Sequence, residues 1–520
     1  MASQEQVEKC IHLLSRKSTD DEKFAGLLLL PRVVDAQDAD AWTHVFDAMD
    51  IRFIERLMRT GIKQSSSAAD HTLLSIAVSV IDVLASHAHI AASMCMLEHI
   101  PTLCTVAAMN IDCISAEAVL VLGKLLAQDA AIDMVLKDPA MLIRVINAAP
   151  ECPEPCQIVQ FLDYALNRSS QFVRAHRDPE VIQGWVATVA CAAAAFAQSH
   201  SVLKFELIPV LANALEPMTT DDAAVIDELE SCLPLAKSVS TGCIAILKQK
   251  TEAMQYTDQA LALYSHLVRL WPQHVFLGLA TQNTAAGTVN RKEAELALRL
   301  SCVEGQAAID SMMITLPDAQ NETHADRERT QRGWKLSVCA EIAAAWLEWV
   351  TRWLDDQPPD SAAVNESAIY AMMNEMQKLA SSIVGFMLDW KERVSSEKTM
   401  LETGPELIVS MVHFLAQWLA TDPKLHQAAM PVLPMCTAWI QSSNEHGPTI
   451  AEYVRPCISF ALESCGISEA QYTADLMTHQ LHHDRSQAQE FASPWVGTIE
   501  FDDFARAVYS IPSDEELLRD

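Results

Sequence analysis

Glycine is scarce in this chain: 14 of the 520 residues are glycine, while 50% are hydrophobic. An average protein contains about 7% glycine. Phosphate-binding loops, tight hairpins and β-bulges need glycine where the backbone adopts positive φ. The shortage argues against a glycine-rich nucleotide site and against a β-sheet protein. A chain rich in alanine, leucine and methionine is instead predicted to be all-α.

Recognisable catalytic motifs are also missing from the sequence. It contains no phosphate loop, no nucleophile elbow, no HExxH helix and no kinase signature. The many carboxylates do not single out an acid/base pair, because the required geometry cannot be read from spacing alone. We therefore predict that the protein is not an enzyme, that it needs no cofactor and that it acts through a binding surface.

Basic residues are few relative to acidic ones, with 37 Lys and Arg against 68 Asp and Glu and a net charge of −31. Nucleic-acid affinity comes largely from Lys and Arg that neutralise phosphates, so nucleic acid is not an expected partner. An anionic membrane surface is disfavoured as an unaided partner for the same reason. Protein segments rich in basic residues would be attracted. The alternative is that the charge only keeps an apolar protein soluble.

Long hydrophobic runs are absent too. The most apolar stretch, Val186–Ala197, is shorter than the roughly 20 residues that cross a bilayer. The first ten residues are polar and acidic and lack the features of a secretory signal. The 14 cysteines are scattered singly through apolar runs, which is typical of reduced, buried thiols. These features predict a cytoplasmic protein without a transmembrane segment.

What the sequence does have is helical periodicity along almost its whole length. It predicts helices over Gln4–Leu14, Asp20–Ala36 and Thr72–Ala85, with Pro31 dividing or kinking the second. Proline also follows a capping residue where new helices are expected to begin, as at Asp178-Pro179. Repeated helix starts after short loops predict an α-solenoid of divergent armadillo/HEAT-like helical hairpins.

The predicted domain organisation is one continuous solenoid over residues 1–485 followed by an irregular acidic tail over 486–520. Polar or proline-rich stretches predict loop breaks within the solenoid. These breaks are expected near residues 64–70, 151–155, 318–330 and 355–361.

Two groups of residues have the side chains of metal ligands. Cys152 and Cys156 lie in a proline-rich turn, but zinc requires further ligands at a matching spacing and none follow nearby. His479 shares a helix face with His482 or His483 at a spacing that chelates metals, whereas the simpler interpretation is a polar helix end. The simpler interpretation is preferred in both cases, so no metal site is predicted.

The candidate partner-binding residues are Trp346, Trp349 and Trp353, which form one stripe along a predicted helix. An exposed stripe of this kind would be an aromatic platform for a partner helix or peptide. A buried stripe would fill the seam between neighbouring helices, which is the commoner use of the pattern. The same two interpretations apply to a group of methionines, namely Met372, Met373 and Met376.

Several segments, in order along the chain, resemble the neurochondrin family. The longest are Asp20–Val34 and Ala41–Leu57, which match an FAALLL-like helix followed by an IFDAVG-like segment. Shorter similarities follow at Lys204–Leu207 and Arg299–Glu304, and a helix pair at Leu407–Pro434 completes the series. The chain departs from the animal pattern after about Ser442, where it is shorter and hard to align.

The resemblance implies a cytosolic, non-catalytic helical-repeat scaffold. The animal members of the family are associated with regulation of calcium/calmodulin-dependent kinase II, binding to receptor cytoplasmic tails, neurite outgrowth and endosomal membranes, and the resemblance implies roles of this kind. An alternative drawn from the charge and predicted fold is a nuclear-transport-type acidic solenoid that embraces basic cargo. Salt-sensitive binding to lysine-rich peptides and to a small GTPase would favour that alternative.

Overall fold

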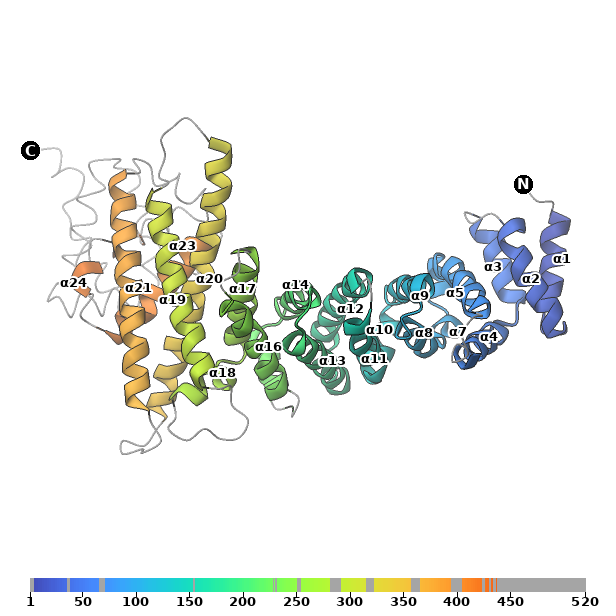
Figure 1. Cartoon of the computed structure of the whole chain (residues 1–520), viewed down its shortest axis with the longest axis horizontal. Coiled ribbons are helices and arrows are strands. Elements are labelled where there is room, and N and C mark those ends of the chain that lie inside the picture. Colours follow the sequence, from blue (N-terminus) through green and yellow to red (C-terminus); the bar gives the residue numbers. More distant parts are fainter. Residues whose placement is uncertain are drawn as a thin grey trace, which may run out of the picture. The chain divides into compact units, whose positions relative to one another are not determined.

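The computed structural model of the chain is an assembly of helices (Figure 1). In the described part of the chain every regular element is helical, apart from one isolated antiparallel bridge between Ser15 and Met49. The prediction of an all-α fold is confirmed. The structure describes residues 4–34, 38–64, 71–152, 155–227, 229, 232–249, 254–280, 291–314, 322–356, 365–393, 405–422, 426–429, 432–433 and 436.

The chain divides into two compact units. Unit 1 comprises Met1–Val275 with Ala285–Val289, and unit 2 comprises Phe276–Thr284 with Asn290–Asp520. One continuous solenoid through residue 485 stays a prediction. The expected acidic tail over 486–520 lies outside the described residues.

Unit 1 consists mostly of short and medium-length helices, with α18 (Pro272–Ala280) at its boundary. They are α1 (Gln4–Leu14), α2 (Asp20–Val33), α3 (Ala39–Ala48), α4 (Ile51–Gln64), α5 (Thr72–Ala85), α6 (Ala88–Ala91), α7 (Met94–Leu97), α8 (Ile100–Ala107), α9 (Asp112–Leu125), α10 (Asp129–Lys137), α11 (Ala140–Ala148), the 3₁₀ turn η1 (Ala149–Glu151), α12 (Pro155–His176), α13 (Pro179–Gln198), α14 (Leu203–Leu215), α15 (Thr220–Asp227), α16 (Cys232–Leu247) and α17 (Met254–Leu270).

The larger helices of unit 1 form two rows. In one row, α5, α9, α12, α14 and α17 pack each against the next; in the other, α4, α8, α11, α13 and α16 do the same (Figure 1). Helices that follow one another in sequence pack across the rows, as α8 does on α9 and α16 on α17. Each such pair is a helical hairpin whose apolar faces are buried by its neighbours, which is the packing of an α-solenoid.

Local sequence signals explain where several helices begin. At α2 the Thr19 hydroxyl accepts a hydrogen bond from the Glu22 N–H at 3.3 Å, and the Glu22 carboxylate accepts one from the Thr19 N–H at 2.7 Å. At α13, Asp178 accepts from the Glu180 N–H at 3.0 Å while Pro179 occupies the first turn, as predicted. Pro31 does not divide the helix, since α2 continues to Val33, and the alternative expectation of a kink at Pro31 stays a prediction.

Helix α13 is the apolar centre of unit 1. It contains the run Val186–Ala197 but begins earlier, at Pro179, so by length and composition it is long enough to cross a membrane. Within the unit it packs against α10, α11, α14 and α16, and 56% of its apolar window is buried. Its indole at Trp185 is fully buried and donates to the Ser170 hydroxyl of α12 at 3.0 Å. These contacts make α13 the core helix of a helical stack.

Unit 2 is built from longer helices: α19 (Arg291–Ile314), α20 (Glu322–Asp355), α21 (Glu366–Arg393), α23 (Pro405–Thr421) and the short α24 (His426–Ala429). Helix α19 packs on α20, and α21 packs on α23. The two pairs also stack, α19 on α21 and α20 on α23, so unit 2 repeats the hairpin arrangement with longer helices.

The loop break expected over residues 318–330 is wrong in extent, because α20 already begins at Glu322. Its first residues are polar and charged but contain neither glycine nor proline, and Glu and Arg are good helix formers. Polarity alone therefore does not indicate a loop. Helix α20 ends at Asp355 and α21 begins at Glu366, and residues 357–361 of the break expected near 355–361 lie outside the described residues.

Candidate functional site

The predicted tryptophan stripe lies in the second half of α20. Trp346 is fully buried, whereas Trp349 and Trp353 are half-buried. The rings of Trp349 and Trp353 stack with their centroids 5.8 Å apart, and Trp349 also contacts Phe276, with centroids 6.0 Å apart. Next to this stack, Leu354 keeps 39% of its surface exposed.

The stripe is thus divided between two roles. Trp346 fills the core of unit 2, as do Met372 at 1% and Met376 at 0% exposure, while Met373 is half-buried. Trp349 and Trp353 retain accessible aromatic surface held in one orientation by stacking. Rigid aromatic side chains of this kind contribute strongly to protein–protein interfaces. The partner-binding role of the stripe stays a prediction, and Trp349 and Trp353 are its accessible members.

Of the two metal candidates from the sequence, only the cysteine pair lies in the described residues, and it is not part of the ligand group found there. Cys152 is half-buried after η1, and Cys156 is exposed in the first turn of α12, where its sulfur accepts from Gln160 Nε2 at 3.4 Å. The histidines His479, His482 and His483 with Asp484 lie outside the described residues.

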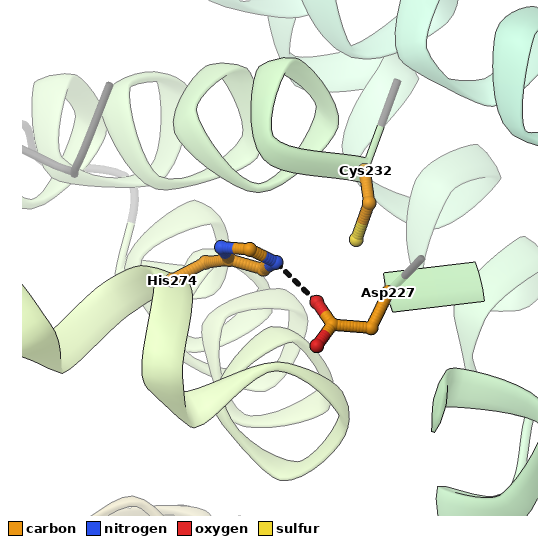
Figure 2. A group of neighbouring side chains, drawn as sticks. All are labelled: Asp227, Cys232 and His274. Atoms are coloured by element: carbon orange, nitrogen blue, oxygen red, sulfur yellow. Dashed lines mark hydrogen bonds and ion pairs between the residues drawn. The ribbon is translucent and has the colours of Figure 1, made fainter. Parts of the chain in front are cut away.

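A different group of potential metal ligands is assembled by the fold of unit 1. Asp227 ends α15, Cys232 begins α16 and His274 lies in the first turn of α18. Figure 2 shows the His274 imidazole facing the Asp227 carboxylate, with the Cys232 sulfur pointing toward the pair. One ligand atom from each residue lies within 4.8 Å of the other two.

Hydrogen bonds hold this group in place. His274 Nε2 is hydrogen-bonded to Asp227 Oδ1, and Gln273 Nε2 donates to Asp227 Oδ2 at 2.9 Å. Burial, together with the negative charge of Asp227, raises the pKa of the Cys232 thiol to about 12. The free thiol is therefore protonated at neutral pH and does not act as a nucleophile there.

The sequence analysis missed this group because its members are separated along the chain. Asp227 and Cys232 flank a helix–helix connection, and His274 comes after the whole of α16 and α17. No standard ligand spacing contains them. The sequence shows only that a carboxylate and a thiol flank the same helix–helix connection. It does not indicate which histidine lies close to that connection in the fold.

A buried polar group links α4 to α8 elsewhere in unit 1. Glu55 accepts hydrogen bonds from His99 Nδ1 at 2.9 Å and from Thr102 Oγ1 at 2.7 Å. Burial opposes ionisation of Glu55, but hydrogen bonds from His99, Thr102 and Arg59 outweigh it and lower the pKa of the carboxyl to about 2. This network fixes one hairpin against the next and is structural.

Comparison with known proteins places this helical architecture in a family. The family model described as Neurochondrin matches residues 2–456, which is most of the chain. The chain belongs to the neurochondrin family. The resemblance drawn from the segments at Asp20–Val34 and beyond is confirmed.

Curated neurochondrins are distant relatives in sequence. Neurochondrin of Rattus norvegicus is 20% identical over 476 residues, covering 88% of this chain and 56% of the rat protein. Neurochondrin of Bos taurus is 24% identical over 459 residues, covering 84% of this chain and 54% of the bovine protein. The chain thus spans about half the length of the curated neurochondrins it matches.

Similarity to solved structures is weak. The crystal structure of an engineered protein aligns over 88% of this chain and 98% of its own, with 13% sequence identity and a TM-score of 0.40. Because that TM-score is low, the assignment of this neurochondrin-family chain as a solenoid rests on its own helix packing.

Proposed function

We propose that this chain is a non-catalytic, cytosolic protein-interaction scaffold, a neurochondrin-like adaptor that binds protein partners carrying basic segments. Membership of the neurochondrin family supports the scaffold role. By the same resemblance, the finer role is regulation of signalling, through calcium/calmodulin-dependent kinase II or through receptor cytoplasmic tails. Peripheral association with endosomal membranes would follow from such partners.

The observation that carries the proposal is the stacking of helical hairpins in the structure. Each hairpin buries its apolar faces against its neighbours, and the remaining helix faces form continuous surfaces along a row. The net charge of −31 accelerates the encounter with basic segments, whereas affinity comes from apolar anchors. The half-buried stack of Trp349 and Trp353 is the anchor we assign to unit 2.

The first test is affinity capture from cytosol at low and at high salt, followed by identification of the retained proteins. Direct binding of each purified partner is then measured. Partners with basic segments whose affinity falls steeply with salt support the acidic scaffold. Retention of a small GTPase together with lysine-rich cargo would favour the nuclear-transport-type alternative.

A matched set of variants tests the anchor. Trp349→Ala with Trp353→Ala should weaken binding of an identified partner at least about tenfold, because aromatic anchors each contribute on the order of 1–2 kcal/mol or more. Trp334→Ala removes an indole of the same helix that is 39% exposed and lies outside the stack. Equal losses in the two variants, or no loss in either, would remove the stack from the proposed site.

A further inference from the structure

The group formed by Asp227, Cys232 and His274 has the composition and convergence of a metal site. A carboxylate, a thiol and an imidazole from three helices meet with their ligand atoms within 4.8 Å of one another. In zinc sites the metal–ligand distances are about 2.0–2.3 Å, so two ligands of one tetrahedral ion lie about 3.3–3.6 Å apart. The three ligand atoms lie near that spacing, and side-chain rotation would have to bring them to it.

We propose that these three residues bind one Zn²⁺ ion, with water as the fourth ligand. The ion would be held by Cys232 Sγ, His274 Nε2 and one Asp227 oxygen (Figure 2). The assignment is independent of the proposed scaffold function, since it concerns the connection between α15, α16 and α18.

The donor set selects the metal. Ca²⁺ and Mg²⁺ take oxygen ligands and do not use a thiol. A mixed set of sulfur, nitrogen and oxygen suits Zn²⁺, which accepts all three in tetrahedral geometry. Three protein ligands leave one position for water.

The site is also accessible to an ion. The side chains of His274 and Asp227 are 21% and 34% exposed, so an ion arriving from solvent meets them first. Cys232 lies beneath them and is 1% exposed. Its sulfur therefore closes the buried side of the site, and water completes the exposed side.

Zinc binding requires one rearrangement and one proton release. His274 Nε2 and Asp227 Oδ1 are in direct hydrogen-bond contact, which is closer than two ligands of one ion, so the ion must separate them. Gln273 holds the other Asp227 oxygen and keeps the carboxylate facing α18. As the zinc–sulfur bond forms, the Cys232 thiol releases its proton to solvent.

The competing explanation is an ion pair that joins α15 to α18, with a buried cysteine beside it by chance. The two explanations differ in metal content. The test uses the full chain, freed of metal with a chelator and titrated with Co²⁺, whose thiolate complexes absorb in the near ultraviolet. If the proposal is right, one Zn²⁺ ion should bind per chain and displace the bound Co²⁺, so that the thiolate–cobalt absorption disappears.

Three variants locate the site. Cys232→Ala and His274→Ala should each abolish the thiolate–cobalt absorption or weaken zinc binding by at least about 100-fold. Substitution of residues that only hydrogen-bond to metal ligands already lowers metal affinity about 10–100-fold, and loss of a ligand itself should cost more. Asp227→Asn keeps the shape of the side chain and one acceptor oxygen but removes its charge, so it should stay folded while binding zinc more weakly. Helical circular dichroism of the metal-free proteins verifies folding.

Two controls make the result decisive. Cys243→Ala removes a second buried cysteine from the same helix, outside the group, and should leave metal binding unchanged. Replacing His479, His482 and His483 together should also leave it unchanged. The proposal is overturned if the wild-type chain shows no thiolate–cobalt absorption, or if Asp227→Asn and Cys232→Ala bind zinc as tightly as the wild type.

Discussion

The two compact units use the same helical hairpin, but Gly184 of unit 1 and Gly385 of unit 2 lie in opposite surroundings. In unit 1, two helix backbones come close together at Gly184 of α13, where a Cβ would lie 1.7 Å from the Leu136 carbonyl oxygen of α10. Large aromatic side chains are fully buried in both units, among them Trp185 and Phe196 in unit 1 and Trp346 and Phe386 in unit 2. A Cβ at Gly385 there meets nothing within 4 Å.

The difference shows how a glycine-poor chain uses its few glycines. At Gly184 the residue permits close helix packing, whereas at Gly385 it has no neighbour to accommodate and only weakens the helix. A position of close backbone contact tolerates no added volume, and a position filled by a buried aromatic ring tolerates no lost volume. The following substitutions test this contrast.

Gly184→Ala should have the largest effect. The added methyl group overlaps a backbone oxygen that cannot rotate away, so α10 and α13 must separate. We expect a loss of at least about 4 kcal/mol in the free energy of unfolding. Denaturant unfolding measures the loss, and hydrogen exchange should place the faster exchange in α10 and α13. A fully stable variant would show that these helices are not packed backbone to backbone.

Trp346→Ala should be the strongest single substitution tested in unit 2. Removing a fully buried indole leaves a cavity and costs about 3–4 kcal/mol. Trp349→Ala, in the same helix, removes a half-buried ring and should cost about half as much. Urea unfolding of the two variants compares them directly, and equal losses would contradict their different burial.

Glu55→Gln tests the polar network of unit 1 through pH. The folded-state pKa of about 2 lies below the ordinary value of 4.5, so the unfolded chain binds more protons between these values. The stabilisation from Glu55 is present above pH 4.5 and is lost as the pH falls toward 2. The variant should lose about 2 kcal/mol at pH 7 and show a shallower acid dependence over that window.

A matched control for the pH experiment is Glu5→Gln, which removes an exposed pair with Lys9 on the surface of α1. Such pairs contribute little to stability. Its acid unfolding should follow that of the wild type. If Glu55→Gln also follows the wild type, the network between α4 and α8 does not stabilise the ionised carboxyl.

Gly385→Ala should have the smallest effect, with the opposite sign. The position is helical and open, so alanine gains helix propensity without a clash, worth about 0.5–1 kcal/mol. A small rise in unfolding temperature would sharpen the contrast with Gly184. A large loss would show that α21 also packs closely at this glycine.

Much of the fold could be predicted from the sequence because its signals are local. Helix periodicity, Asp178-Pro179 and the scarcity of glycine depend only on neighbouring residues, and they predicted the helices and their class. The start of α20 was misplaced because charged helix-forming residues resemble a loop in polarity. Pro31 does not divide α2, and the sequence does not show how near the end of that helix it lies.

The candidate sites could be predicted only in part. A stripe such as Trp346, Trp349 and Trp353 has a readable period, but which members are buried depends on partner helices that periodicity does not identify. The grouping of His274 with Asp227 and Cys232 depends on how α17 and α18 return to α15. Contacts between distant segments of this kind carry no local signature.

The two-row packing of unit 1 also bears on how the chain acquires its structure. Each helix packs mainly on the next helix of its row or on its neighbour in sequence, so most contacts join segments near one another in sequence. Such contacts close short loops and form rapidly. During synthesis, an emerging hairpin finds its packing partner already made, and the unit can grow one hairpin at a time behind the ribosome.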